Sequence, residues 1–135
     1  MRAFDNDTIQ LISAFERITR SRVRDCLKVN GEDGPEVMFV IDKGGMGKAI
    51  GRGGENIKNA EEMMGCRIRA FEYSENVAEF VKNLVPSAKS VKVENGKAII
   101  KAARRGAVIG RNGENIRILK QILERNSSIR EIEVK

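Results

Sequence analysis

The sequence predicts an α/β (α+β) fold of two successive small domains, each in the order α-β-β-α-α-β with a mixed three-stranded sheet backed by helices. Three observations predict it. An eleven-residue segment at 47–57 recurs at 106–116 with eight identical positions. The periodicity of apolar residues predicts the same order of elements around both copies. Asn95-Gly96 separates two β-prone runs, which is a strong signal for a two-residue hairpin.

The first domain is expected to begin with a helix over residues 5–20, where apolar side chains recur at helical spacing after an Asp/Asn-rich start that can cap the first turn. Two β-prone runs at 23–30 and 36–42 flank a turn cluster at 31–35 and predict a hairpin. The remaining expected elements are a short Gly-rich helix at 43–50, a turn at 51–54, a helix at 55–64 that ends at Gly65, and a strand at 66–73.

The second domain repeats this order. Its first helix is expected over 76–85, because four apolar residues form a stripe there and Pro86 follows. In each domain the last strand follows a helical crossover, so we expect it to lie parallel to a hairpin strand. The other expected elements are strands at 89–94 and 97–102, a helix at 104–109, a turn at 110–113, a helix at 114–125 and a strand at 129–134.

Charge is distributed unevenly between the two domains. The repeat is offset by 59 positions, which divides the 135-residue chain into domains at 1–73 and 74–135. The first domain has 12 Lys and Arg against 12 Asp and Glu, and the second has 13 against 7. The second domain therefore carries the whole net charge of +6, which suits an anionic partner such as nucleic acid or a membrane surface.

The repeated segment contains a glycine-bracketed turn that leads into a helix. Glycine permits positive φ and leaves no Cβ between backbone and ligand, and a helix N-terminus attracts phosphate. An arginine adds positive charge at the tip. Asn112 replaces a glycine, but asparagine tolerates the left-handed conformation, so we expect the same geometry in both copies. The turn residues are Gly51, Arg52, Gly53 and Gly54, and Gly110, Arg111, Asn112 and Gly113.

An alternative is that each turn only joins two helices. Glu55 and Glu114, which follow the turns, then serve to complement the helix dipole. The duplication of the turn with its arginine retained favours phosphate binding over this alternative.

The turns and the order of elements resemble the KH domain, whose Gly-x-x-Gly loop joins two helices and clamps about four nucleotides of single-stranded RNA. The α-β-β-α-α-β order is similar to the type II, prokaryotic-style KH domain. Two such units in tandem over nearly the whole chain resemble the archaeal NusA-like transcription termination/antitermination factors. Bacterial NusA also has an N-terminal polymerase-binding region and an OB-type domain, for which this sequence shows no counterpart. The resemblance thus implies binding of single-stranded RNA, with RNA polymerase or the elongation complex as a further candidate partner.

The resemblance also implies where RNA is contacted, because in KH domains the bases lie between the two loop-flanking helices and the adjacent strand. The matching basic residues are Lys48, Lys58, Arg67 and Arg69 in the first domain, and Arg105, Arg117 and Lys120 in the second. Each of them is alternatively an ordinary solvated charge. With five Phe and one Tyr, most at core-periodic positions, the chain has few rings on which to stack bases.

The sequence argues against catalysis. Residues 42–49 approach the phosphate-loop pattern, but Asp42 replaces its leading glycine and Ala49 replaces its Ser/Thr magnesium ligand. There is no histidine to act as a base, and Cys26 and Cys66 lack the spacing of a zinc site. We therefore expect no enzyme activity and no cofactor. The cysteines are expected to be buried apolar residues, with a disulfide as the alternative in a hyperthermophilic source.

No apolar run approaches the roughly 18 to 20 residues that span a bilayer, and the N-terminus has no signal-peptide core. We expect a cytoplasmic monomer without a membrane partner. Two alternatives to a role in transcription stay open. One is a protein-interaction module with purely structural turns, and the other is a ribosome-associated or RNA-decay role for the same pair of KH domains.

Overall fold

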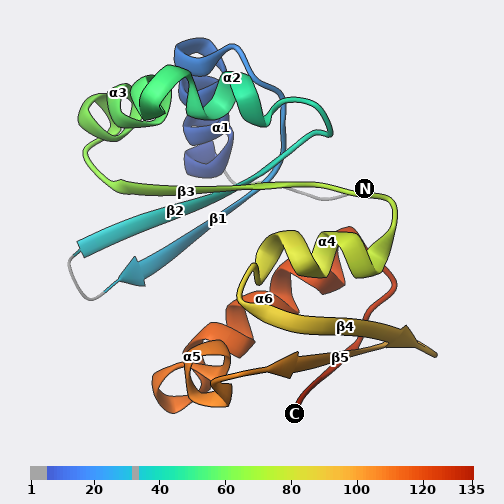
Figure 1. Ribbon diagram of the computed structural model, residues 1–135. Helices are drawn as coiled ribbons and strands as arrows, with labels where there is room; N and C mark the ends of the chain where they lie inside the picture. The colour runs from blue at the N-terminus through green and yellow to red at the C-terminus, as the bar shows by residue number, and fades with distance from the viewer. Residues whose placement is uncertain (1–5, 32–33) are drawn as a thin grey trace. The chain divides into compact units, whose positions relative to one another are not determined.

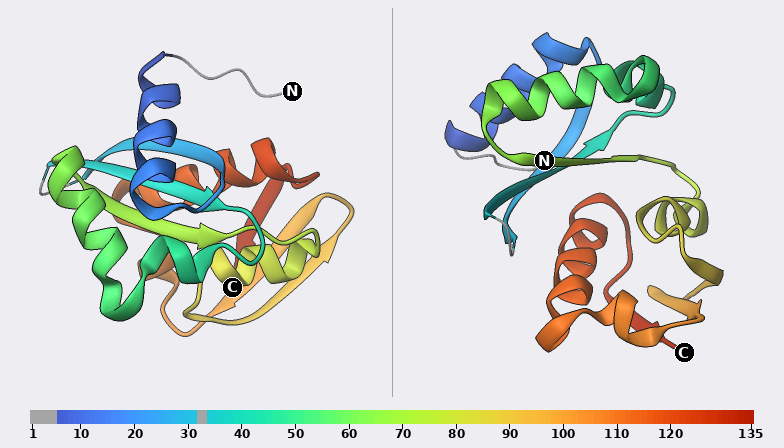
Figure 2. Two further views of the ribbon diagram at one scale, coloured as in Figure 1. Left: turned by 90° about the horizontal axis from the view of Figure 1, so that it is seen from above. Right: turned by 60° about the vertical axis from the view of Figure 1, so that its left-hand side comes forward.

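The computed structural model describes residues 6–31 and 34–135, and the chain divides into two compact units, Met1–Tyr73 and Ser74–Lys135. Each unit is a three-stranded sheet with helices on one face (Figures 1 and 2). Residue 5, where the first helix is expected to begin, and part of the expected turn at 31–35 lie outside the described residues. None of the described helices is long and apolar enough to cross a membrane.

The first unit has a mixed sheet with β2 in the centre. β1 pairs with β2 in antiparallel register and β3 pairs with β2 in parallel register, as expected for a strand that follows a helical crossover. The elements are α1 (Asn6–Thr19), β1 (Val23–Gly31), β2 (Gly34–Ile41), α2 (Met46–Ile50), η1 (Arg52–Gly54), α3 (Glu55–Met64) and β3 (Arg67–Glu72).

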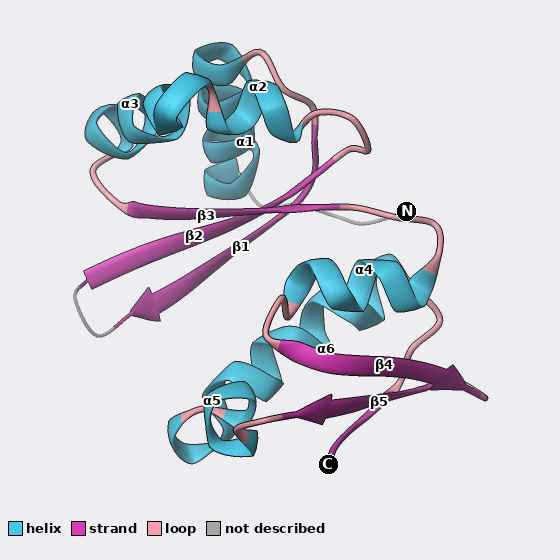
Figure 3. Ribbon diagram, in the orientation of Figure 1, coloured by secondary structure: helices cyan, strands magenta, loops and turns pink. Residues whose placement is uncertain are grey.

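The second unit repeats this topology, with β5 central between antiparallel β4 and parallel β6 (Figure 3). Asn95 and Gly96 join β4 to β5 with φ of 48° and 77°, so both residues of the hairpin turn have positive φ. The predicted fold class and order of elements are confirmed. The elements are α4 (Val77–Leu84), β4 (Ala88–Glu94), β5 (Lys97–Ala102), α5 (Arg105–Ile109), η2 (Arg111–Gly113), α6 (Glu114–Asn126) and β6 (Glu131–Val134).

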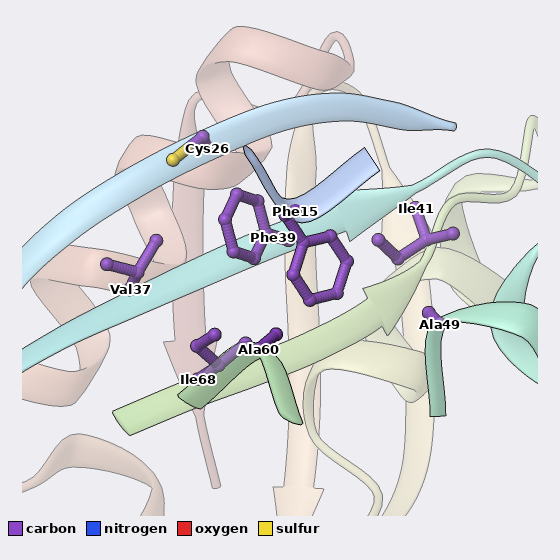
Figure 4. Close-up of a cluster of buried hydrophobic side chains, with 8 residues drawn as sticks. All are labelled: Phe15, Cys26, Val37, Phe39, Ile41, Ala49, Ala60 and Ile68. Atoms are coloured by element: carbon purple, nitrogen blue, oxygen red, sulfur yellow. The ribbon is translucent and has the colours of Figure 1, made fainter. Parts of the chain in front are cut away.

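The core of the first unit lies between the helices and one face of the sheet (Figure 4). Phe15 of α1 stacks on Phe39 of β2 with ring centroids 4.2 Å apart. Ala49 of α2 and Ala60 of α3 are fully buried, and their small side chains let both turn-flanking helices pack closely on the sheet. The core therefore holds the two helices that carry the turn. Its other members are Cys26, Val37, Ile41 and Ile68.

The second unit buries the equivalent positions with larger side chains. Val108 of α5 and Leu119 of α6 occupy the positions of Ala49 and Ala60, 59 residues later, and both are buried. Ala98 and Ile100 of β5 are also buried, and so is Phe80 of α4, as expected from the apolar stripe of its helix. The two turns thus stand on equivalent helix pairs despite different core residues.

Both cysteines are free thiols. Cys26 belongs to the first core, as expected for a small apolar residue. Cys66, directly before β3, is only half-buried. Burial first, and the nearby negative charge of Glu61 second, raise the pKa of the Cys66 thiol above its ordinary value of 9.0.

Candidate nucleic-acid interface

The two Gly-x-x-Gly turns, residues 51–54 and 110–113, have nearly identical backbones. The first glycine has φ and ψ of 77° and 172° at Gly51 and of 78° and 171° at Gly110. The third residue is left-handed in both turns, with 63° and 20° at Gly53 and 56° and 25° at Asn112. The last glycine is also left-handed in both turns. Asn112 therefore takes the expected conformation.

The position at which the two turns differ is the one with free space around it. A Cβ added at Gly53 would meet no atom within 4 Å, which explains why asparagine fits at 112. A Cβ at Gly51 would lie 2.7 Å from Cγ of Asn56, and one at Gly110 would lie 2.6 Å from Cγ of Asn115. The first glycine is thus required both by its backbone angles and by close packing.

Backbone hydrogen bonds close each turn in the same way. The N–H of Gly51 donates to the Gly47 carbonyl at 2.9 Å, and the N–H of Gly54 donates to the Gly51 carbonyl at 3.2 Å. The second turn repeats both bonds at 2.8 and 3.1 Å, through Gly110 and Gly113. The last glycine of each turn directly precedes a long helix, α3 or α6, so each turn presents the positive end of a helix dipole.

Side-chain amides form a further hydrogen bond across each turn, which the sequence did not predict. Asn56 Nδ2 donates to the Lys48 carbonyl at 2.7 Å, and Asn115 Nδ2 donates to the Ala107 carbonyl at 3.2 Å. Each bond joins the helix after the turn to the short helix before it. The signal that points to these asparagines is their identity in both copies of the repeated segment.

Exposed cations surround the first turn. Arg52 lies at its tip, Lys48 lies on the helix before it and Lys58 on the helix after it, and all three are exposed. Glu55, at the start of α3, is the acid closest to the turn in sequence. The structure thus brings together three of the predicted basic residues in the first unit, one from each element of the helix-turn-helix segment.

In the second unit some of the predicted cations already have protein partners. Arg117 Nη2 donates to the carbonyl of Asn112 at 2.9 Å, so this arginine supports the turn itself. Lys120 Nζ lies 3.8 Å from Glu124 on the same helix. Arg105 Nε donates to the Val134 carbonyl at 3.1 Å, which attaches α5 to β6. Arg111 is exposed at the tip of the turn.

Arg67 and Arg69 are placed away from the turn. Ile68 and Ala70 pack into the core beneath the helices, so the alternate residues of β3 point to the opposite face of the sheet. On that face the Arg69 guanidinium lies 5.2 Å from the centre of the Phe71 ring, and Nη1 lies 3.7 Å from a Glu36 carboxylate oxygen. RNA contact through these two arginines stays a prediction.

The repeated fold and turn define a class of protein with two KH domains, and the KH domain family matches this chain twice, over residues 36–102 and 74–135. The first match extends from β2 through β5 and so crosses the division at Tyr73–Ser74, whereas the second coincides with the second unit. KH domains bind single-stranded RNA. An RNA-binding role follows from this class.

Comparison with individual proteins assigns the chain to a narrower family. It is 33% identical to the probable transcription termination protein NusA of Methanococcus vannielii, over 96% of this chain and 78% of that protein. The protein of the same name from Methanocaldococcus jannaschii is 34% identical over 95% and 72%, and that of Halococcus morrhuae is 32% identical over 99% of both chains. The chain therefore belongs to the archaeal NusA-like family of KH-domain proteins, which confirms the resemblance found in the sequence.

A solved structure has the same architecture along its whole length. The crystal structure of APE1850 matches with a TM-score of 0.73 and 30% sequence identity, and the match covers 98% of this chain and 100% of that one.

Proposed function

We propose that this protein binds single-stranded RNA with both Gly-x-x-Gly turns and acts, without catalysis, in transcription termination or antitermination. The names of the archaeal relatives support the role in transcription. RNA polymerase or the elongation complex is the proposed protein partner, and the protein is proposed to act as a monomer in the cytoplasm.

The observation that carries the proposal is the occurrence of one turn geometry twice in the chain. Both turns place two successive left-handed residues directly before a helix, with an exposed arginine at the tip. Left-handed backbone without a bulky Cβ lets a sugar-phosphate chain approach, and the helix dipole and the arginine favour its negative charge. A turn that only joins two helices requires neither the arginine nor its retention.

In the proposed complex, the turns hold phosphates and the flanking helices lie beside the bases. Lys48 and Lys58 extend the positive surface on either side of the first turn. In the second unit Arg111 is the proposed phosphate contact, while Arg117 keeps the turn in place through the Asn112 carbonyl. Lys120 is proposed to contact RNA one helical turn further along α6, as it is three residues from Arg117.

The test replaces Arg111 and Asn112 by Asp in one variant. Two acids where a phosphate is proposed to lie are expected to weaken binding of a fluorescent single-stranded RNA by more than tenfold, about 1.4 kcal/mol or more. The melting temperature is expected to stay unchanged, because both side chains are exposed. Duplex RNA is expected to compete poorly for the wild-type protein.

A matched control variant makes the same change in charge at the other end of α6. Lys92→Asp with Asn95→Asp alters two exposed residues of the β4–β5 hairpin, whose Gly96 carbonyl accepts bonds from the segment after α6. If the control weakens binding as much as the turn variant, net charge and not the turn explains the binding. Equal affinities of the turn variant and the wild type would make the turn purely structural and favour a protein-interaction module.

The role in transcription needs a separate assay. The protein is added to an archaeal transcription reaction with a terminator template, and the fraction of terminated transcripts is measured. The proposal expects the wild type to change this fraction and the turn variant to have lost the effect. RNA binding without any change in termination would favour the ribosome-associated or RNA-decay role.

A further inference from the structure

The same side-chain hydrogen bond spans the turn in both units. In each, the donor is the amide of the asparagine at the second position of the following helix, Asn56 or Asn115. The acceptor is the carbonyl of the third residue of the preceding helix, Lys48 or Ala107. The accepting residue differs between the copies, Lys48 against Ala107, whereas the donating asparagine is the same in both.

The accepting carbonyls belong to helices that are too short to satisfy them. α2 and α5 have five residues each, and the last four carbonyls of a helix have no donor within it. If α2 continued, the Lys48 carbonyl would accept from the N–H of Arg52, but the backbone of Gly51 directs the chain away. The Asn56 amide supplies a donor to this carbonyl from the next helix.

The first glycine of each turn leaves room for this asparagine because it has no Cβ. A Cβ at Gly51 would approach Cγ, the backbone nitrogen and Cβ of Asn56 within 2.7 to 2.9 Å. A Cβ at Gly110 would approach Cγ, Nδ2 and Cβ of Asn115 within 2.6 to 2.9 Å. The glycine and the asparagine thus pack directly on one another, and a side chain at the glycine would displace the amide from its carbonyl.

We infer that Asn56 and Asn115 are positioning residues of the RNA clamp. Each ties the helix before the turn to the helix after it, and so holds the direction in which the intervening backbone and arginine point. The asparagines carry no charge, so they act on the geometry of the turn and not on long-range attraction. This inference rests on the proposed function of the same turns.

The test compares the double variant Asn56→Ala/Asn115→Ala with a control, Asn59→Ala/Gln121→Ala, which removes exposed amides from the same two helices. The variant Asn56→Ala/Asn115→Ala loses one hydrogen bond in each turn and is expected to bind single-stranded RNA at least about three- to tenfold more weakly, because each loss lowers the population of the binding-competent turn. The slope of log affinity against log salt is expected to stay the same, because no phosphate contact is lost.

Amide hydrogen exchange measures, in the absence of RNA, how firmly the asparagine hydrogen bonds hold the turns. Exchange of four hydrogen-bonded amides is expected to accelerate in the variant Asn56→Ala/Asn115→Ala and to stay unchanged in the control. These are the amides of Gly51, Gly54, Gly110 and Gly113. If the wild type binds no RNA, the proposed function fails, and hydrogen exchange alone decides whether the two asparagines hold the turns in place. If the double variant does not fold, the two single variants are measured in its place.

Three results would overturn the inference. Unchanged exchange with unchanged affinity would show that the bonds hold nothing in place. Faster exchange with unchanged affinity would limit the asparagines to a structural role. A weaker affinity with a flatter salt slope and unchanged exchange would show that the amides contact RNA themselves.

Discussion

At the scale of single residues, the turn tolerates change only where the structure leaves room. The two copies differ at position 53 against 112, where an added Cβ meets nothing within 4 Å and the backbone is left-handed. Gly51 and Gly110 are retained, and their φ and ψ lie in a region that is almost restricted to glycine. The difference between the copies thus reports which glycine is replaceable.

A pair of substitutions at neighbouring glycines tests this distinction. Gly51→Ala is expected to destabilise the protein by at least about 1–3 kcal/mol, because alanine must adopt a strained backbone and collides with Asn56. Gly53→Asn copies the residue that the second turn already has, and is expected to cost less than about 1 kcal/mol. Urea unfolding of both variants measures the difference. Equal losses of stability would show that the contact with Asn56 is unimportant.

The basic residues show where sequence reasoning about the site ended. The arginines at the turn tips and the left-handed Asn112 followed from residue type and repetition alone. The face of β3 did not, because Ile68 and Phe71 are both buried although an odd spacing places them on opposite faces of a strand. Only the register with β2 assigns Arg67 and Arg69 to the face away from the turn. Arg105 and Arg117 likewise have backbone acceptors that no sequence pattern reveals.

At the scale of secondary-structure elements, the order of helices and strands could be predicted because each depends on local chemistry. Positive φ at Asn95 and Gly96 produces the hairpin, and Gly65 ends α3 in a left-handed conformation. The ends of some elements differed. The last strand begins at Glu131, where its pairing with Lys97 of β5 starts, and not at the expected residue 129, although Ile129 is fully buried. That residue satisfies the apolar pattern of a strand without belonging to the ladder.

The start of α4 offers a test of an element boundary. Asn76 is its N-cap, and the side chain accepts a hydrogen bond from the N–H of Glu79 at 3.0 Å. Asn76→Ala is expected to destabilise the protein by about 0.5–2 kcal/mol, whereas Asn76→Asp keeps the acceptor and is expected to have little effect. Thermal unfolding of the two variants provides the comparison. A melting temperature of the alanine variant equal to that of the wild type would mean that water replaces the cap at no cost.

At the scale of the whole molecule, the two units have the same turn geometry but different net charges. The turns are alike, but residues 74–135 hold 13 basic against 7 acidic residues while residues 1–73 are balanced. Long-range attraction to a polyanion follows net charge, whereas the clamp follows local geometry. We therefore expect both turns to hold RNA and the second unit to provide most of the attraction. The assignment of residues 1–73 and 74–135 to two separate KH domains stays a prediction.

The salt dependence of binding separates the two contributions. Each neutralised phosphate contributes about −0.7 to the slope of log affinity against log salt for a single strand. Arg111→Asp is expected to flatten this slope more than Arg52→Asp, because the more basic unit neutralises more of the strand. Fluorescence titrations over a range of salt concentrations measure both slopes. A larger effect of the Arg52 change would identify the first turn as the principal clamp, despite the balanced charge of its unit.

The most direct measurement follows the backbone amides of the whole protein while single-stranded RNA is added. The largest nuclear magnetic resonance shift changes are expected at residues 51–54 and 110–113 and in the first turns of α3 and α6, where N–H groups precede or begin a helix. Both turns are expected to respond over the same range of RNA concentration. Shift changes confined to the strands, with the amides of both turns unmoved at saturating RNA, would contradict a backbone clamp built from the two turns.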